Sequence, residues 1–174
     1  MVKGILVKSS ELLTDDEQLE IQKQFKNNNI EVIFLDDKNN IHASFDSFIE
    51  LILHSEFLNM LALGVAVELL KELVFKIVGT IKKKKAVIIN SDGKKTPAKL
   101  TIKSTTDKGT IYLEVSNDIS DKGFQASIEK IIEAKKILDG SGNGINDLYI
   151  LEDKSGCISI MTLNEYIIYR KNQE

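Results

Sequence analysis

The chain has 174 residues, a formal net charge of −3 and 43% hydrophobic residues, enough to form a buried core, which excludes a wholly disordered chain. A single cysteine excludes a disulfide framework and a cysteine-based zinc cluster. Arg170 is the only arginine among 23 basic residues, which excludes recognition that needs several guanidinium groups on phosphate or guanine.

The N-terminal segment reads as strand, helix, strand. Alternating apolar residues predict strands over 2–7 and 30–35, and a helix runs between them from about 15 to 27. Thr14 and Glu17 have the spacing of a capping box, in which each side chain bonds the backbone of the other residue. This order favours a parallel strand pair with a right-handed crossover.

Residues 46–81 are the most apolar stretch. We expect Asp46 or Ser47 to cap a helix, and residues 57–81 to form one long helix that is apolar almost all round. Too many charges follow residue 67 for a simple membrane span, so the helix is predicted to be buried against a sheet, or against a second copy or a partner. The residues expected to make such an interaction are Leu58, Ala62, Val65, Ala66, Leu69 and Leu73.

Positive charge follows this helix. Residues 76–103 hold nine lysines and one acidic residue, whereas residues 11–50 hold ten acidic residues and three lysines. Lysines at the end of an apolar helix stabilise its C-terminus and keep it soluble. The alternative is contact with an anionic surface, either lipid or a nucleic-acid backbone. The candidate anion-binding residues are Lys82, Lys83, Lys84, Lys85, Lys94 and Lys95.

The next segment predicts three strands and a helix. Strands over 86–90, 98–103 and 110–115 are expected to form an antiparallel meander with one buried face. An amphipathic helix over 120–138 follows, with Ser120 as its cap.

The C-terminal segment predicts a hairpin of residues 148–152 and 157–161, followed by a short helix that opens with a capping box at Thr162 and Glu165. We therefore expect an α+β fold with one mixed sheet, packed against the long apolar helix and the 120–138 helix. Residues 1–174 are expected to form one domain, with 148–174 as a possible appendage.

The glycine-rich loop 139–147 has the most site-like pattern. Its oxygen-bearing residues at alternate positions are similar to those of a calcium loop, but the twelfth position is Ile150 in place of a bidentate glutamate. A plain connector with Gly140 at the helix end is the competing interpretation. The candidate metal ligands are Asp139, Ser141, Asn143 and Asp147.

Side chains for catalysis are few. His42 and His54 are the only histidines, and the acidic pair Asp36 and Asp37 follows a predicted strand. Cys157 is expected to be a small buried side chain in a strand. No motif for nucleotide, phosphate or zinc binding is present, and we infer no cofactor and no small-molecule substrate.

The leading prediction is a non-enzymatic interaction module that self-associates or binds a protein partner through the 57–81 helix. The alternative is binding of lipid or a nucleic-acid backbone through the lysine-rich segment, and the third is an enzyme with an unrecognised site. The N-terminal segment has too short an apolar run for a signal peptide, so the bacterial cytoplasm is the expected location.

Overall fold

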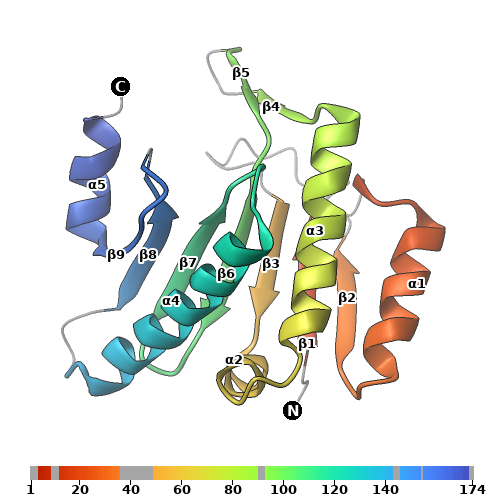
Figure 1. Ribbon diagram of the computed structural model, residues 1–174, viewed down its shortest axis with the longest axis horizontal. Helices are drawn as coiled ribbons and strands as arrows, with labels where there is room; N and C mark the ends of the chain where they lie inside the picture. The colour runs from red at the N-terminus through yellow and green to blue at the C-terminus, as the bar shows by residue number, and fades with distance from the viewer. Residues whose placement is uncertain are drawn as a thin grey trace.

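The computed structural model describes residues 4–8, 12–35, 49–89, 93–142, 146–153 and 155–172. Helices pack on a mixed sheet of seven strands in the order β2-β1-β3-β6-β7-β8-β9, and β4 and β5 form a separate two-stranded sheet. This confirms the predicted α+β fold with one mixed main sheet (Figure 1).

The N-terminal unit has the predicted form. The strands β1 (Gly4–Lys8) and β2 (Glu31–Leu35) pair in parallel, and α1 (Asp15–Lys26) connects them. The capping box forms, because the Thr14 hydroxyl accepts from the Glu17 backbone and the Glu17 carboxylate accepts from the Thr14 N–H. Asn29 adopts the left-handed conformation that reverses the chain into β2.

The prediction of a helix after Asp46 or Ser47 is wrong for residues 49–53, which the structure describes. Asp46 and Ser47 themselves lie outside the described ranges. Residues 49–53 form β3 (Ile49–Leu53), which pairs antiparallel with β1 and parallel with β6. Ile49, Leu51 and Leu53 are all buried, so their spacing of two residues places them on one face of a strand.

The predicted helix over 57–81 is two helices, α2 (Ser55–Ala62) and α3 (Val67–Lys84). Gly64 and Ala66 between them have positive φ angles of 74° and 67°, which no α-helix allows. The break gives each helix its own direction. Each helix therefore buries one face, while Leu63 and Val65 of the turn between them are exposed.

The meander is confirmed only in part. The strands β6 (Leu100–Thr105) and β7 (Thr110–Val115) form the expected antiparallel pair. However, β4 (Val87–Ile89) lies outside the main sheet and pairs with β5 (Lys95–Pro97), a strand the sequence analysis does not predict.

The C-terminal elements follow the prediction closely. Ser120 caps α4 (Asp121–Gly140), and β8 (Asp147–Glu152) pairs antiparallel with β9 (Ile158–Thr162). The capping box of Thr162 and Glu165 opens α5 (Leu163–Lys171). Since β8 also pairs in parallel with β7, the hairpin is part of the main sheet.

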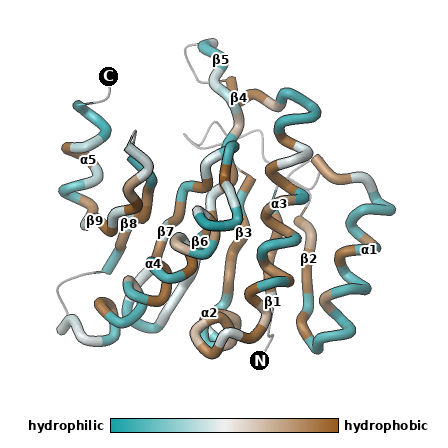
Figure 2. Tube along the Cα trace, in the orientation of Figure 1, coloured by the Kyte–Doolittle hydropathy of each residue, from teal (hydrophilic) through white to brown (hydrophobic). Residues whose placement is uncertain are grey.

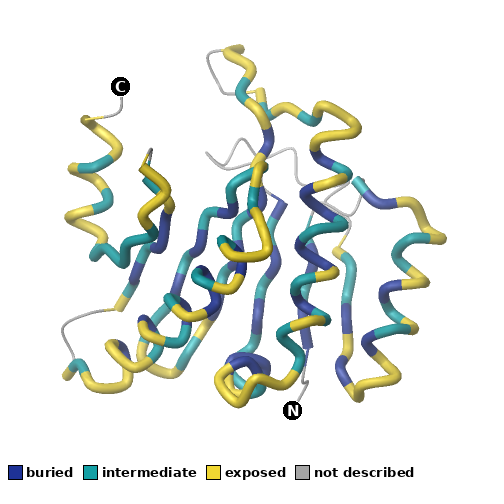
Figure 3. The backbone as a smooth tube through the Cα atoms, in the orientation of Figure 1, coloured by how far each residue is buried: buried dark blue, intermediate teal, exposed yellow. Residues whose placement is uncertain are grey.

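The two faces of the sheet differ. Helices α1, α3 and α4 cover one face, where the brown strand segments of Figure 2 and the dark blue segments of Figure 3 contribute to one hydrophobic core. Alternate residues of β6, β7 and β8 point to the opposite face, where Thr101, Lys103, Tyr112, Glu114 and Tyr149 are half-buried. Among the described helices, none is long and apolar enough to cross a membrane.

Candidate functional site

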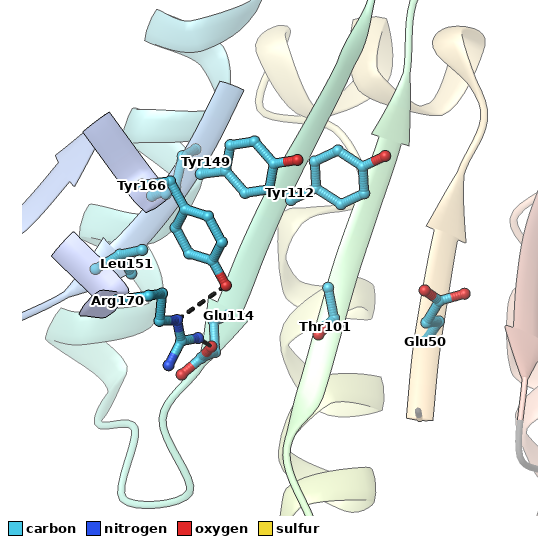
Figure 4. A pocket seen from close by; sticks show the side chains of 9 residues that line it. Glu50, Thr101, Tyr112, Glu114, Tyr149, Leu151, Tyr166 and Arg170 are labelled. Atoms are coloured by element: carbon cyan, nitrogen blue, oxygen red, sulfur yellow. Dashed lines mark hydrogen bonds and ion pairs between the residues drawn. The ribbon is translucent and has the colours of Figure 1, made fainter. Parts of the chain in front are cut away.

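A cleft of about 460 Å³ lies on the sheet face opposite the helical layer, in the size range of ligand sites. We call it the tyrosine cleft (Figure 4). Strands β3, β6, β7 and β8 form its floor, and α5 forms one wall. Its principal lining residues are Glu50, Thr101, Tyr112, Glu114, Tyr149, Leu151, Tyr166 and Arg170.

Three tyrosines stack beside the cleft. Tyr112 and Tyr149 are cross-strand neighbours whose ring centroids lie 4.9 Å apart, and Tyr166 of α5 stacks on Tyr149 at 4.4 Å. Lys103 lies over Tyr112, and the Arg170 guanidinium lies over Tyr166. The ring faces are therefore occupied by one another and by two cations, so a ligand would meet ring edges and hydroxyl groups.

Glu114 links the sheet to α5. Its carboxylate accepts hydrogen bonds from Lys99 at 2.5 Å and from Arg170, whose Nε also donates to the Tyr166 hydroxyl at 2.9 Å. Burial opposes ionisation of Glu114, but the Lys99 hydrogen bond and the Arg170 charge outweigh it, so the pKa of Glu114 is lowered. Glu50 is likewise paired, with Lys8 at 3.0 Å. The carboxylates of the cleft are thus neutralised from within the protein.

Two hydroxyl groups of the cleft are free to bind. Within the described part of the chain, the hydroxyls of Thr101 and Tyr149 have no hydrogen-bond partner. Burial raises the pKa of Tyr112 and Tyr149, so both phenols are protonated and can donate at neutral pH. The cleft therefore offers hydroxyls to a ligand and leaves no carboxylate uncompensated by a cation.

The predicted interaction residues of 57–81 differ in how far they are buried. Leu58 and Leu73 are buried in the core, and Leu69 and Ala66 are half-buried. Ala62 and Val65 are exposed at the turn between α2 and α3. Only this turn leaves part of the predicted surface accessible, and it adds Leu63, which is 80% exposed.

The lysine-rich segment is exposed, as Figure 3 shows near β4 and β5. Lys82 pairs with Asp118 at 2.7 Å, and Lys84 donates to the Leu12 carbonyl at 2.6 Å. All six candidate anion-binding lysines lie on the end of α3 or around β5. The ladder pairs Ile89 with Lys95 and Val87 with Pro97, so the two lysine runs lie at opposite ends of this two-stranded sheet.

The other candidates do not converge. Asp139 is paired with Lys135, the Ser141 hydroxyl donates to the Leu138 carbonyl, and Asp147 belongs to β8. Asn143 lies outside the described residues, among which no group of three or more acidic, histidine or cysteine side chains is placed to hold a metal.

The catalytic candidates are also dispersed. His54 precedes α2 and does not line the tyrosine cleft, and His42, Asp36 and Asp37 lie outside the described residues. The prediction for Cys157 is wrong, because it is exposed in the turn between β8 and β9. The turn needs its backbone N–H, which donates to Asp153, and not its side chain.

Comparison with protein-family models, curated proteins and solved structures finds no match for this chain. The function must therefore be argued from the geometry alone.

The tyrosine cleft is not evident from the sequence alone. One signal was present, since Tyr112 and Tyr149 each occupy a polar-face position in a strand whose flanking residues are apolar. Their contact depends on the parallel pairing of β7 with β8, and the contribution of Arg170 depends on where α5 folds.

Proposed function

We propose that the protein is a non-enzymatic interaction module, and that the tyrosine cleft with α5 is the surface that binds a protein partner. The observation that carries the proposal is the gathering of three of the four tyrosines and the only arginine at one concave site. Tyrosine and arginine are the residues most enriched at the centre of protein interfaces, where lysine is depleted.

The outer side of α5 supports the same conclusion. No residue of α5 is buried, although the helix carries three large apolar residues that are exposed, Ile168 to 61%. A helix with apolar residues beyond the face that holds it to the sheet is typical of a docking surface. The other two exposed residues are Leu163 and Ile167.

The cleft defines the chemistry of the partner segment. Charged side chains would have to compete with ion pairs already formed by Glu50 and Glu114, whereas the Thr101 and Tyr149 hydroxyls can bond a ligand without breaking a hydrogen bond within the protein. We therefore propose an uncharged segment with hydroxyl or amide side chains in the cleft, flanked by apolar residues on α5.

Selection of random peptides displayed on phage against the immobilised full-length protein tests this proposal. Selected peptides should share a core rich in serine, threonine, asparagine or glutamine. Replacing Thr101→Val and Tyr149→Phe removes both hydroxyls and keeps the side-chain shapes, so it should weaken binding about fivefold for each hydroxyl removed.

The matched control is Thr105→Val, which makes the same change as Thr101→Val at an exposed residue of β6 that does not line the cleft. Binding to this variant should equal binding to the wild-type protein. Peptides with a charged core, or peptides that bind the double variant as tightly as the wild type, would contradict the proposal. Binding of small neutral polar molecules alone would assign the cleft to a metabolite instead.

We propose the turn between α2 and α3 as a second interaction surface, through which two copies of the protein associate. Leu63 at the turn between α2 and α3 is the most exposed large apolar residue among those described. If this turn joins two copies, sedimentation velocity should show a concentration-dependent dimer that Leu63→Ser abolishes and Leu19→Ser on α1 preserves. A monomer at every concentration would exclude the turn as a self-association surface.

The cellular location belongs to the proposal as well. We propose that the protein acts in the cytoplasm, since its single cysteine can form no intramolecular disulfide of the kind common in exported proteins.

A further inference from the structure

The small sheet of β4 and β5 extends beyond the strands of the main sheet, at the end of α3 (Figure 1). Three cross-strand pairs hold it together, and the Ala98 N–H continues the pairing by donating to the Ala86 carbonyl at 2.9 Å. We call the end of α3 together with β4 and β5 the basic ribbon, comprising residues 82–89 and 94–97.

One side of β4 is apolar and unprotected. Val87 is 51% exposed and Ile89 is 62% exposed, and their spacing of two residues places them on the same side of the strand. Ile88 between them packs against the core, which fixes the orientation of the strand. Leaving two β-branched residues in water is unfavourable, so this side is suited to an apolar environment.

Three exposed lysines lie along the basic ribbon. Lys95 lies directly opposite Ile89 in the ladder, and Lys83 and Lys85 are exposed where α3 ends. None of these three lysines has a carboxylate partner among the described residues. A surface of negative charge would supply counter-charges to all three lysines at once.

The combination distinguishes among anionic partners. The phosphates of a nucleic-acid backbone would attract the lysines but would give no apolar environment to Val87 and Ile89. The basic ribbon also has neither an arginine nor an aromatic residue for base contacts. A bilayer with anionic lipids interacts favourably with both the lysines and the apolar pair, because its phosphates attract lysine and its acyl boundary accepts apolar side chains.

We propose that the basic ribbon binds the surface of a bilayer containing anionic lipids, with Val87 and Ile89 entering the headgroup region and Lys83, Lys85 and Lys95 contacting lipid phosphates. This surface is separate from the tyrosine cleft and does not depend on the function proposed for it.

Co-sedimentation of the full-length protein with vesicles tests the proposal. Vesicles of phosphatidylcholine with phosphatidylglycerol should bind the protein, and vesicles of phosphatidylcholine alone should not. Lys83→Gln and Lys95→Gln should each weaken binding about fivefold, and binding should fall as salt rises. Ile89→Ser should weaken binding at low and at high salt, because it removes apolar burial and no charge.

Two matched controls isolate the surface. Lys136→Gln on α4 makes the same charge change and Leu19→Ser on α1 the same kind of polarity change, and both residues are exposed away from the basic ribbon. Both variants should bind vesicles like the wild-type protein. Tyrosine circular dichroism of each variant verifies that it is folded, so a loss of binding reports on the surface.

Three results would overturn the proposal. The first is no binding to anionic vesicles at low salt. The second is equal weakening by Lys136→Gln and Lys83→Gln, which would indicate only a net-charge effect. The third is duplex DNA binding as strong as vesicle binding with no effect of Ile89→Ser, which would assign the basic ribbon to nucleic acid.

Discussion

Gly109 allows the backbone before β7 to lie close to the backbone before β8. The Thr110 N–H donates to the Asn146 carbonyl at 2.7 Å, and a Cβ on Gly109 would lie only 1.8 Å from that oxygen. Close backbone approach of this kind admits only glycine.

We predict that Gly109→Ala destabilises the protein by about 1–3 kcal/mol, because the backbone at Asn146 must move. Gly79→Ala is the matched control, since a Cβ there would touch nothing and alanine favours the interior of α3 by about 1 kcal/mol. Chemical denaturation followed by circular dichroism measures both. Equal stability of the Gly109 variant and the wild type would contradict the close approach.

Glu114 should make the stability of the protein depend on pH. Its folded-state pKa lies below the ordinary value of 4.5, so the folded state binds fewer protons than the unfolded state in this range. The stabilisation is thus fully present above pH 4.5 and is lost as pH falls through the lower, folded-state pKa.

The variant Glu114→Gln tests this dependence. The wild type should be more stable than the variant at neutral pH by about 1 kcal/mol, the usual size for a partly exposed ion pair. Denaturation at several pH values should show this difference shrinking below pH 4.5. The capping boxes also lower the pKa values of Glu17 and Glu165. Both residues are present in the wild type and in the variant, so their contributions to the pH dependence cancel in the difference. A pH-independent difference would show that Glu114 contributes no charge interaction.

At the scale of elements, the turn between α2 and α3 is held by backbone conformation. Gly64 has a φ angle of 74° and nothing within 4 Å of the position a Cβ would occupy. We predict that Gly64→Ala costs about 1 kcal/mol through left-handed strain alone. Gly140→Ala, which also meets open space but lies at the end of α4, should not destabilise. Thermal denaturation compares the two, and equal effects would contradict the assignment to strain.

The elements also show where local sequence patterns are sufficient. Both capping boxes form as predicted, because Thr14 with Glu17 and Thr162 with Glu165 need only three residues of chain. The strand β3 was predicted as a helix, since a short apolar run satisfies either period until its neighbours are known. Pairing with β1 and β6 on both sides decides in favour of the strand.

For the whole molecule, the buried apolar residues of the described chain other than Leu151 form one cluster that includes residues from Ile5 to Ile150. We therefore predict a single unfolding transition, with far-ultraviolet and tyrosine circular dichroism changing together. This also tests the expectation of one domain. An earlier transition of the tyrosine signal would mean that the region of β8, β9 and α5 unfolds separately.

Local sequence patterns account for the caps, for the amphipathic character of α4, for the strands β6 and β7, and for the parallel unit of β1, α1 and β2. These features depend on residues close together in the chain, where spacing alone sets the geometry. The order of the strands in the sheet and the position of α5 depend instead on contacts between residues far apart in the chain, which no local spacing specifies. These contacts place Tyr112 and Tyr149 in a cleft beneath α5, and they leave β4 and the lysines that flank it outside the main sheet.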